Sequence, residues 1–290
     1  MVRQNPSLII TDAKNSKAPQ IPAATDPEVT VWRDRHGALG ALSHVVDKEP
    51  WLHVLGVASY KLDLAKNAVL AVPCEHATPE AIVDEFQSTA WPTALQIQGW
   101  EVLHSSAVNT SRGVVALCAA SETGKSTLAY ALSQRGYAQW ADDVVVLEIS
   151  PQSVRAHPLP YHIRLRPASA LYFGYSHDQI RGGRVRCEGL QKDGAVPLRT
   201  ICLLEQAETL PGKQVVTIEP LTGAEALIGA LEHALYFSLQ DRLRKRRMMQ
   251  QYLNLIRQVA VFKVRFHRGL ERLPSIVDRL EQRILAEISV

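Results

Sequence analysis

Short apolar runs separated by polar turns dominate residues 27–99 and predict strands followed by helices. Residues Tyr60–Leu64 alternate apolar and polar side chains, as expected for a strand with one buried face. Further strands are predicted at 29–33, 51–57 and 68–72. Thr78 and Pro79 suit the N-cap and first turn of a helix that ends near Ser88, and a second helix is predicted at about 92–98. We therefore expect a small α+β domain at 27–99, preceded by a flexible polar arm at 1–26.

From residue 100 onward, apolar strands alternate with helical segments, a pattern typical of α/β proteins. Strands are predicted at 113–118, 142–149, 198–204, 214–218 and 261–266, and Val154–His157 is expected to pair back on the second of these. Helices are predicted at 126–135, 222–233 and 237–259, with a closing helix from Pro274. Glycines and charges fill 174–197 and predict a long polar loop, a kind of segment that is often functional. We expect 100–290 to form one α/β domain with a helical C-terminal part.

Composition narrows the class of protein. The chain has 290 residues, of which 46% are hydrophobic and 21% charged, so it can bury a large core and is not a disordered chain. A formal net charge of +3 is too small to indicate nucleic acid as a partner. The four cysteines are scattered, which is typical of reduced intracellular thiols. Residues 1–20 are polar, and no apolar run has the eighteen or so residues of a membrane span, so we expect a cytoplasmic protein without a membrane partner.

The run Ala119–Thr127 has the pattern of a phosphate-binding loop between a strand and a helix. In such loops, backbone N–H groups and the positive helix end surround a polyphosphate, while Lys125 adds a full charge and the Ser126 hydroxyl coordinates Mg²⁺. The nucleotide-binding residues predicted from this run are Ala119, Ser121, Glu122, Thr123, Gly124, Lys125, Ser126 and Thr127.

Two residues depart from the usual G-x-x-x-x-G-K-[ST] pattern. Ala119 stands where the first glycine is usual, and it fits without strain only if its φ is negative. Glu122 places a carboxylate near bound phosphate, which is repulsive unless it points to solvent or to a basic partner. These residues leave open a competing function, a nucleotide-binding scaffold or pseudokinase.

Two further motifs flank the loop at regular spacing. His104 precedes Lys125 by 21 positions, and the adjacent carboxylates of Asp142 and Asp143 begin 17 positions after it. Paired carboxylates suit phosphoryl transfer, because one can hold Mg²⁺ while the other accepts the proton of an attacking hydroxyl. The residues alone do not decide which carboxylate has which role.

Together the three motifs resemble the catalytic domain of the HPr kinase/phosphorylase family, a P-loop fold with a mixed sheet that is related to phosphoenolpyruvate carboxykinase. The matching segments are Leu103–Ala107, Gly124–Leu128, Arg135–Tyr137 and Ala141–Val144, within roughly residues 99–160. The resemblance implies that Lys125 binds the β- and γ-phosphates of ATP and that Ser126 and Asp143 position Mg²⁺. It also implies that Asp142 is the general base and that His104 lies close to the reacting phosphate.

The likeness is partial, and this bears on the substrate. The first hundred residues do not resemble the usual HPr kinase N-terminal domain, and no good match is found to the stretch that serves partner docking in genuine HPr kinases. HPr itself is therefore not the expected acceptor.

The wider family includes kinases that tailor lasso peptides at a serine, so the resemblance implies a serine kinase acting on a peptide or small protein. Because family members often form oligomers, it also implies a homo-oligomer. A small-molecule kinase on the same fold is a further alternative.

Several of these residues also have ordinary structural interpretations. His104 alone would suit a buried core histidine, and Asp142-Asp143 alone would suit a turn at the start of a strand. The basic run Arg242–Arg247 is typical of a solvated helix face, although it could attract an acidic partner. Arg164 and Arg166 could reach a phosphate. Four basic residues of the long polar loop could clamp phosphate or peptide, or simply lie on the surface: Arg181, Arg184, Arg186 and Lys192.

Overall fold

The computed structural model describes residues 6–11, 17–33, 37–180, 185–188, 194–212, 214–236 and 241–285, without the side chains of 186–188. The chain divides into two compact units, one of Met1–Trp100 with Leu235–Arg247 and the other of Glu101–Ala234 with Met248–Val290. The sequence pattern places 235–247 in the second domain, whereas the structure assigns this segment to the first unit. The segment could not be predicted to be separate, because no local sequence pattern distinguishes it from the residues that follow.

In the described part of the first unit, six strands form a sheet in the order β1-β6-β5-β4-β3-β2, antiparallel except for the β1–β6 pair. The strands are β1 (Ser7–Ile10), β2 (Thr30–Arg33), β3 (Leu39–Val46), β4 (Glu49–Val54), β5 (Ala58–Asp63) and β6 (Ala68–Pro73). The predicted strands are all present, whereas the sequence pattern does not predict β1 and β3. The expectation of a flexible arm at 1–26 is corrected at β1, which gains backbone hydrogen bonds from β6.

Two short helices follow this sheet, α1 (Pro79–Glu85) and α2 (Trp91–Ile97), joined by a π-helical turn at Phe86–Ala90. Thr78 caps α1 as predicted, because its hydroxyl accepts a hydrogen bond from the Ala81 backbone N–H at 3.2 Å. The phenol of Tyr60, fully buried on β5, donates to the carbonyl of Ile82 at 2.8 Å and so ties α1 to the sheet.

The described part of the second unit contains a mixed sheet of nine strands, so the α/β class expected from the sequence is confirmed at this level. The strand order is β10-β8-β9-β15-β12-β11-β7, and β17 lies between β15 and β16. Among the described strands of this sheet, only the β9–β15 and β15–β17 pairs are parallel. The strands are β7 (Glu101–Leu103), β8 (Ser105–Thr110), β9 (Gly113–Cys118), β10 (Ala138–Ala141), β11 (Val145–Ile149), β12 (Val154–His157), β15 (Val196–Gln206), β16 (Val216–Leu221) and β17 (Ala260–Phe266).

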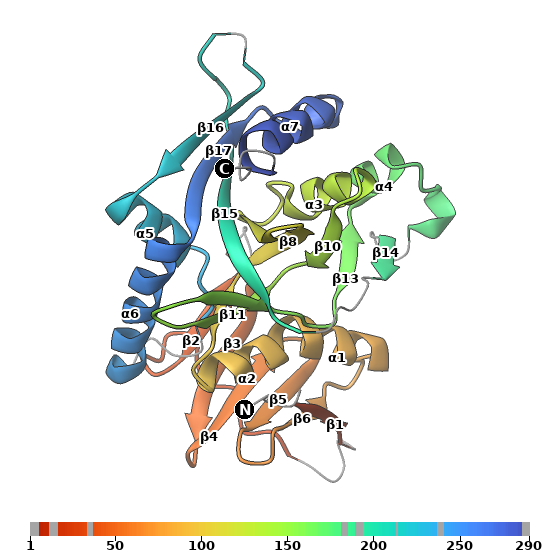
Figure 1. Cartoon of the computed structure of the whole chain (residues 1–290). Helices are drawn as coiled ribbons and strands as arrows, with labels where there is room; N and C mark the ends of the chain where they lie inside the picture. The colour runs from red at the N-terminus through yellow and green to blue at the C-terminus, as the bar shows by residue number, and fades with distance from the viewer. Residues whose placement is uncertain are drawn as a thin grey trace. The chain divides into compact units, whose positions relative to one another are not determined.

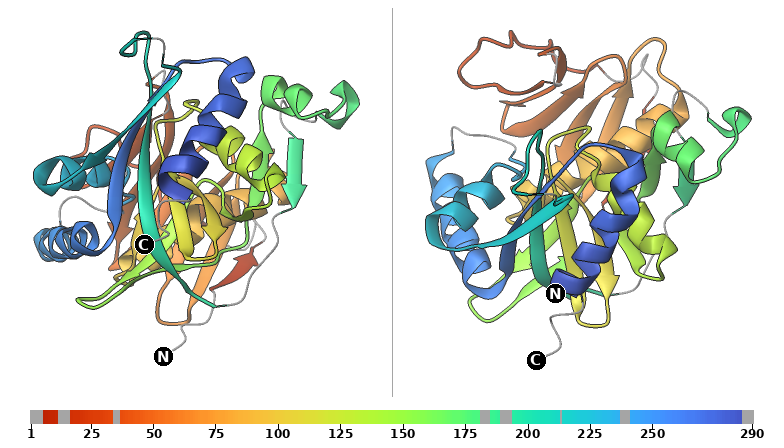
Figure 2. Two further views of the ribbon diagram at one scale, coloured as in Figure 1. Left: turned by 45° about the horizontal axis from the view of Figure 1, so that its top comes forward. Right: turned by 90° about the horizontal axis from the view of Figure 1, so that it is seen from above.

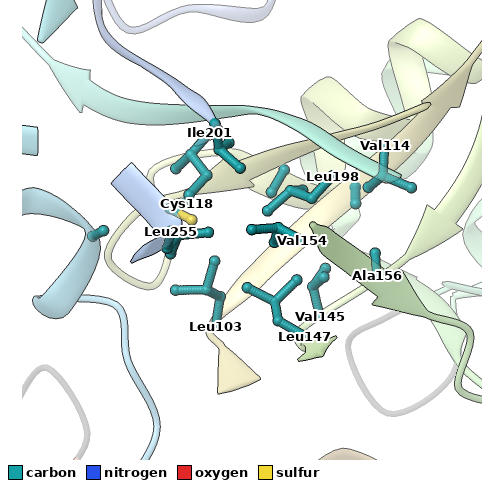
Figure 3. Close-up of a cluster of buried hydrophobic side chains, with 14 of the residues drawn as sticks. Leu103, Val114, Cys118, Val145, Leu147, Val154, Ala156, Leu198, Ile201 and Leu255 are labelled. Carbon is teal, nitrogen blue, oxygen red and sulfur yellow. The ribbon is translucent and has the colours of Figure 1, made fainter. Parts of the chain in front are cut away.

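Helices cover both faces of this sheet. On one face, α5 (Gly223–Leu231) and the C-terminal part of α6 (Arg242–Gln258) bury residues such as Ala230 and Leu255 against the strands. Figure 3 shows this cluster, with Leu255 beside Cys118 and Leu103. On the other face, α3 (Lys125–Gln134) and α7 (Leu273–Leu280) pack through Leu132 and Ile276. Figures 1 and 2 show the two helix pairs on opposite sides of β15 and β17.

A small hairpin stands beside α3 (Figure 1). It consists of β13 (His162–Leu165) and β14 (Val185–Glu188), and α4 (Pro167–Tyr172) follows β13. The predicted polar loop at 174–197 is corrected here, because it contains β14 and a turn of 3₁₀-helix at His177–Gln179. Arg181, Arg184 and Lys192 and the side chain of Arg186 lie outside the described residues, so a clamping role for them stays a prediction.

Two further expectations are adjusted. The predicted strand at 142–149 begins only at Val145, because Asp143 has φ +69° and this left-handed conformation breaks the extended chain. The predicted helix at 237–259 corresponds to α6, and 237–240 lie outside the described residues. Within the described ranges, no helix combines the length and apolar character that a membrane span requires.

Candidate functional site

The loop from Ala119 to Gly124 connects β9 to α3, as the local sequence predicts. Gly124 stands at the N-cap with φ +114°, a conformation that glycine adopts without strain, and its carbonyl accepts the Leu128 N–H at 2.9 Å. Because α3 has ten residues, its free N–H groups and dipole make the loop end a favourable place for an anion.

Both departures from the usual loop pattern are accommodated. Ala119 is fully buried and does not have a positive φ, so its methyl group causes no backbone strain. Glu122 has φ +70°, and its carboxylate forms an ion pair with the guanidinium of Arg166, the residue that precedes α4. The negative charge next to the proposed phosphate position is thus paired with a basic partner.

Lys125 is held under the loop by two acceptors. Its ammonium group donates to the Ala119 carbonyl at 3.0 Å and lies 3.1 Å from Nε2 of His104. Burial lowers the pKa of Lys125, while the nearby Asp143 and Asp142 oppose this. The side chain is only 6% exposed, yet neither of these two acceptors is an acid, so its charge is available to an incoming anion.

His104 is neutral at ordinary pH. Burial first, and the positive charge of Lys125 second, lower the pKa of His104 to about 4, while a hydrogen bond to the Asp143 backbone carbonyl opposes the shift. A neutral ring that donates to this carbonyl leaves Nε2 as the acceptor for Lys125. His104 therefore orients Lys125 without competing for its charge.

The two acids after β10 have very different surroundings. Asp142 is only 4% exposed, and its carboxylate accepts the Ser106 hydroxyl at 2.6 Å and the Arg164 backbone N–H at 3.1 Å. It is also hydrogen-bonded to Ser126 of the loop. Burial and the adjacent Asp143 raise the pKa of Asp142 to about 6, although these hydrogen bonds oppose the shift.

Asp143, in contrast, faces a cavity of about 470 Å³ that begins at the loop. His104, six loop and helix residues from Ser121 to Ser126, and Thr127 line the same cavity, whereas Ala119 and Asp142 are buried behind it. The Asp143 carboxylate has no hydrogen-bond partner among the described residues. The sequence motifs therefore converge on one site, with Asp143 at its surface and Asp142 in its wall.

Charge in the cavity favours an anion. Four basic side chains line it, those of Lys125, Arg164, Arg166 and Arg268, against two acidic ones, Glu122 and Asp143, which leaves an excess of two positive charges. A multiply charged phosphate ester suits such a cavity, because each charged hydrogen bond contributes about 1.5–3 kcal/mol.

The far wall of the cavity is not predicted by any motif. It consists of residues at and after the ends of β15 and β17: Gln206, Phe266, Arg268, Gly269, Leu270, Leu273 and Ile276. The amide of Gln206 donates to the Thr123 carbonyl at 3.0 Å and so supports the loop. No sequence signal links these residues to the loop, because only the pairing of β9, β15 and β17 brings them together.

The oxygen ligands near the loop suit Mg²⁺. The Ser126 hydroxyl and the carboxylates of Asp142 and Asp143 are hard donors, and Mg²⁺ is usually held by one or two carboxylates, substrate phosphates and waters. Within the described part of the chain, no cluster of three or more His, Cys, Asp or Glu side chains could hold a metal by itself.

Comparisons with known proteins give limited similarity. No protein-family model and no curated protein matches the chain. Among solved structures, the chain is similar to the Hpr(Ser) kinase/phosphatase from Coxiella burnetii, at 16% identity and a TM-score of 0.35, over 64% of this chain and 92% of that chain. The functional assignment therefore depends on the chemistry of the site itself.

Proposed function

We propose that the protein is an ATP-dependent, HPr-kinase-like serine kinase that transfers the γ-phosphate to a serine hydroxyl of a peptide or small protein. The observation that carries this proposal is the convergence of Lys125, His104 and Asp143 on the cavity at the phosphate-binding loop, with Asp142 hydrogen-bonded to the loop residue Ser126. A loop between a strand and a helix can bind a polyphosphate, and the nearby Asp143 carboxylate can accept a proton.

In this proposal, the chain's own groups bind and orient the nucleotide. Backbone N–H groups of the loop and of the first turn of α3 hold the phosphates, and Lys125 moves from the Ala119 carbonyl to the β- and γ-phosphates. Mg²⁺ supplies charge neutralisation at the phosphates when it is bound. Ser126 would hold the ion, and Asp142 would orient Ser126.

Proton removal is assigned to Asp143 on grounds of access. The acceptor hydroxyl gives its proton to the base as its oxygen forms a bond to the γ-phosphorus, and the bond from that phosphorus to the bridging oxygen of ADP breaks. A base must come within hydrogen-bond distance of that hydroxyl. Asp143 lines the cavity, while the oxygens of Asp142 already accept hydrogen bonds. The family resemblance implies the reverse assignment, with Asp142 as base and Asp143 at the metal, and both remain testable.

Two experiments test the proposal. Calorimetry with ATP and Mg²⁺ should show binding, and Lys125→Ala should weaken it at least about tenfold, because a charged hydrogen bond to phosphate is lost. Lys66→Ala, at a residue whose side chain is 81% exposed on the first unit, is the matched control and should leave affinity unchanged. Labelled ATP and a panel of serine-containing peptides should then yield phosphopeptide.

The outcomes separate the alternatives. Binding of ATP without transfer to any peptide would favour the scaffold or pseudokinase, and transfer only to small hydroxyl compounds would favour a small-molecule kinase. Absence of ATP binding would reject all three.

Replacing Glu122 by glycine should strengthen ATP binding by about tenfold, which corresponds to about 1.4 kcal/mol. The change removes a carboxylate from the phosphate site, frees Arg166, and suits the backbone, since φ at this position is +70°. Calorimetry with ATP measures the gain. Glu122→Gln removes the charge but keeps the side chain, so it should give most of the same gain. Equal or weaker binding in both variants would show that the carboxylate does not oppose phosphate.

A further inference from the structure

We propose that Arg164 is a further catalytic residue, whose guanidinium binds the terminal phosphoryl group of the nucleotide and neutralises its charge during transfer. This inference rests on the proposed function. It concerns a residue outside the loop and outside both flanking motifs, which sequence patterns connect to the site only weakly.

The backbone of Arg164 is fixed to the acidic pair. Its N–H donates to Oδ2 of Asp142 at 3.1 Å, and the same carboxylate is hydrogen-bonded to Ser126 at the start of α3. One carboxylate therefore connects the main chain of β13 to the phosphate-binding loop. Arg164 and Ser126 are therefore hydrogen-bonded to the same carboxylate, Arg164 through its backbone and Ser126 through its side chain.

The strand directs that side chain into the cavity. Along β13, Ile163 and Leu165 are 5% and 1% exposed and pack in a small core with Ala170 and Val185. Because side chains alternate along a strand, Arg164 points away from this core, and it lines the cavity together with Lys125 and Asp143.

Its charge is available. Among the described residues, the guanidinium of Arg164 has no ion-pair or hydrogen-bond partner, whereas the neighbouring Arg166 is paired with Glu122. The cavity therefore offers one group to each reactant, a guanidinium to the nucleotide phosphate and a carboxylate to the acceptor hydroxyl. Arg164 suits a phosphoryl oxygen, and Asp143 suits a hydroxyl proton.

Guanidinium groups that contact a transferring phosphoryl group increase its transfer rate by about 10³–10⁵-fold in other phosphotransferases. Because this contact is made to the terminal phosphate, Arg164 should distinguish ATP from ADP. Lys125, which reaches the β-phosphate as well, should contribute to the binding of both nucleotides.

The test compares ATP and ADP affinities, and transfer rates, in Arg164→Ala and Arg164→Lys. The alanine variant keeps the backbone N–H to Asp142, so it removes the side chain alone. We expect ATP to bind about tenfold more weakly with ADP affinity unchanged, and transfer to fall by about 10³-fold. The lysine variant should be intermediate, since it keeps the charge but loses the planar fork. Added guanidinium ion should partly restore transfer in the alanine variant only.

Arg257→Ala, at an exposed residue of α6, is the control and should change neither affinity. Equal weakening of ATP and ADP, or unchanged ATP affinity, in Arg164→Ala would overturn the inference. If the wild-type protein binds ATP but transfers no phosphate, the proposed kinase function fails, and with it the catalytic role of Arg164. In that case, loss of the preference for ATP over ADP in Arg164→Ala would still place the Arg164 guanidinium at the terminal phosphate. A wild-type protein that binds neither nucleotide would overturn both proposals.

Discussion

Replacing Asp143 by asparagine should lower the rate of phosphoryl transfer by about a thousandfold, within the range that a general base contributes, and leave ATP affinity nearly unchanged. Asparagine is the sharpest substitution, because it removes the basic oxygen but tolerates the left-handed conformation that residue 143 adopts, with φ +69°. Single-turnover transfer from labelled ATP measures the chemical step, and calorimetry measures binding.

The matched variant is Asp142→Asn. If Asp142 orients Ser126 and the metal, this variant should require more Mg²⁺ for half-maximal rate, whereas Asp143→Asn should not. The reverse pattern, with a raised Mg²⁺ requirement in Asp143→Asn and loss of the chemical step in Asp142→Asn, would establish the assignment that the family resemblance implies.

The pH dependence gives an independent check on Asp142. Its pKa is raised to about 6, so the ionised form that accepts the Ser106 and Ser126 hydroxyls is present above that pH and is lost as the pH falls through it. At Mg²⁺ concentrations below saturation, transfer by the wild-type protein should therefore decline as the pH falls through 6, toward the rate of Asp142→Asn at the same Mg²⁺ concentration. The remaining activity of Asp142→Asn should lack this decline.

Local patterns predict the parts of the site that are continuous in sequence. A strand, a loop and a helix that follow one another between Gly113 and Gln134 have short-range signals, namely an apolar run, a glycine at the N-cap and a helical period. The Thr78 cap is predictable for the same reason. The burial of Asp142 is not predictable, because it depends on Ser106 and Arg164, which reach it only in the folded chain.

Elements whose sequence has no distinctive hydrophobic period cannot be predicted in this way. The four residues of β1 form a strand because β6 offers a free edge, and the far wall of the cavity exists because β17 pairs with β15 and places Phe266 beside Gln206. At Asp143 the sequence pattern instead predicts too much strand. The apolar residues after it indicate a strand from 142 onward, but Asp143 itself adopts a left-handed conformation and its side chain lines the cavity. The periodicity of a sequence does not report such single-residue turns.

Replacing Gly113 by alanine should lower the free energy of unfolding of the second unit by about 3 kcal/mol, combining about 1–2 kcal/mol of backbone strain with a steric clash. Gly113 begins β9 with φ +136°, and a Cβ atom there would lie 2.3 Å from the Pro197 carbonyl oxygen on the adjacent β15. The carbonyl cannot move away easily, because β15 pairs with β9 immediately beyond it, at Leu198 and Val114.

Gly136→Ala separates strain from clash. Gly136 also has a positive φ, +95°, but nothing lies within 4 Å of the position that a Cβ atom would take, so only the conformational cost of about 1 kcal/mol is expected. A urea titration monitored by hydrogen exchange of peptides from β9 and β15 measures the free energy of unfolding of the second unit in both variants. Equal destabilisation would mean that β9 and β15 separate to admit the methyl group. Because β9 leads directly into the phosphate-binding loop, that separation would also weaken ATP binding in Gly113→Ala and not in Gly136→Ala.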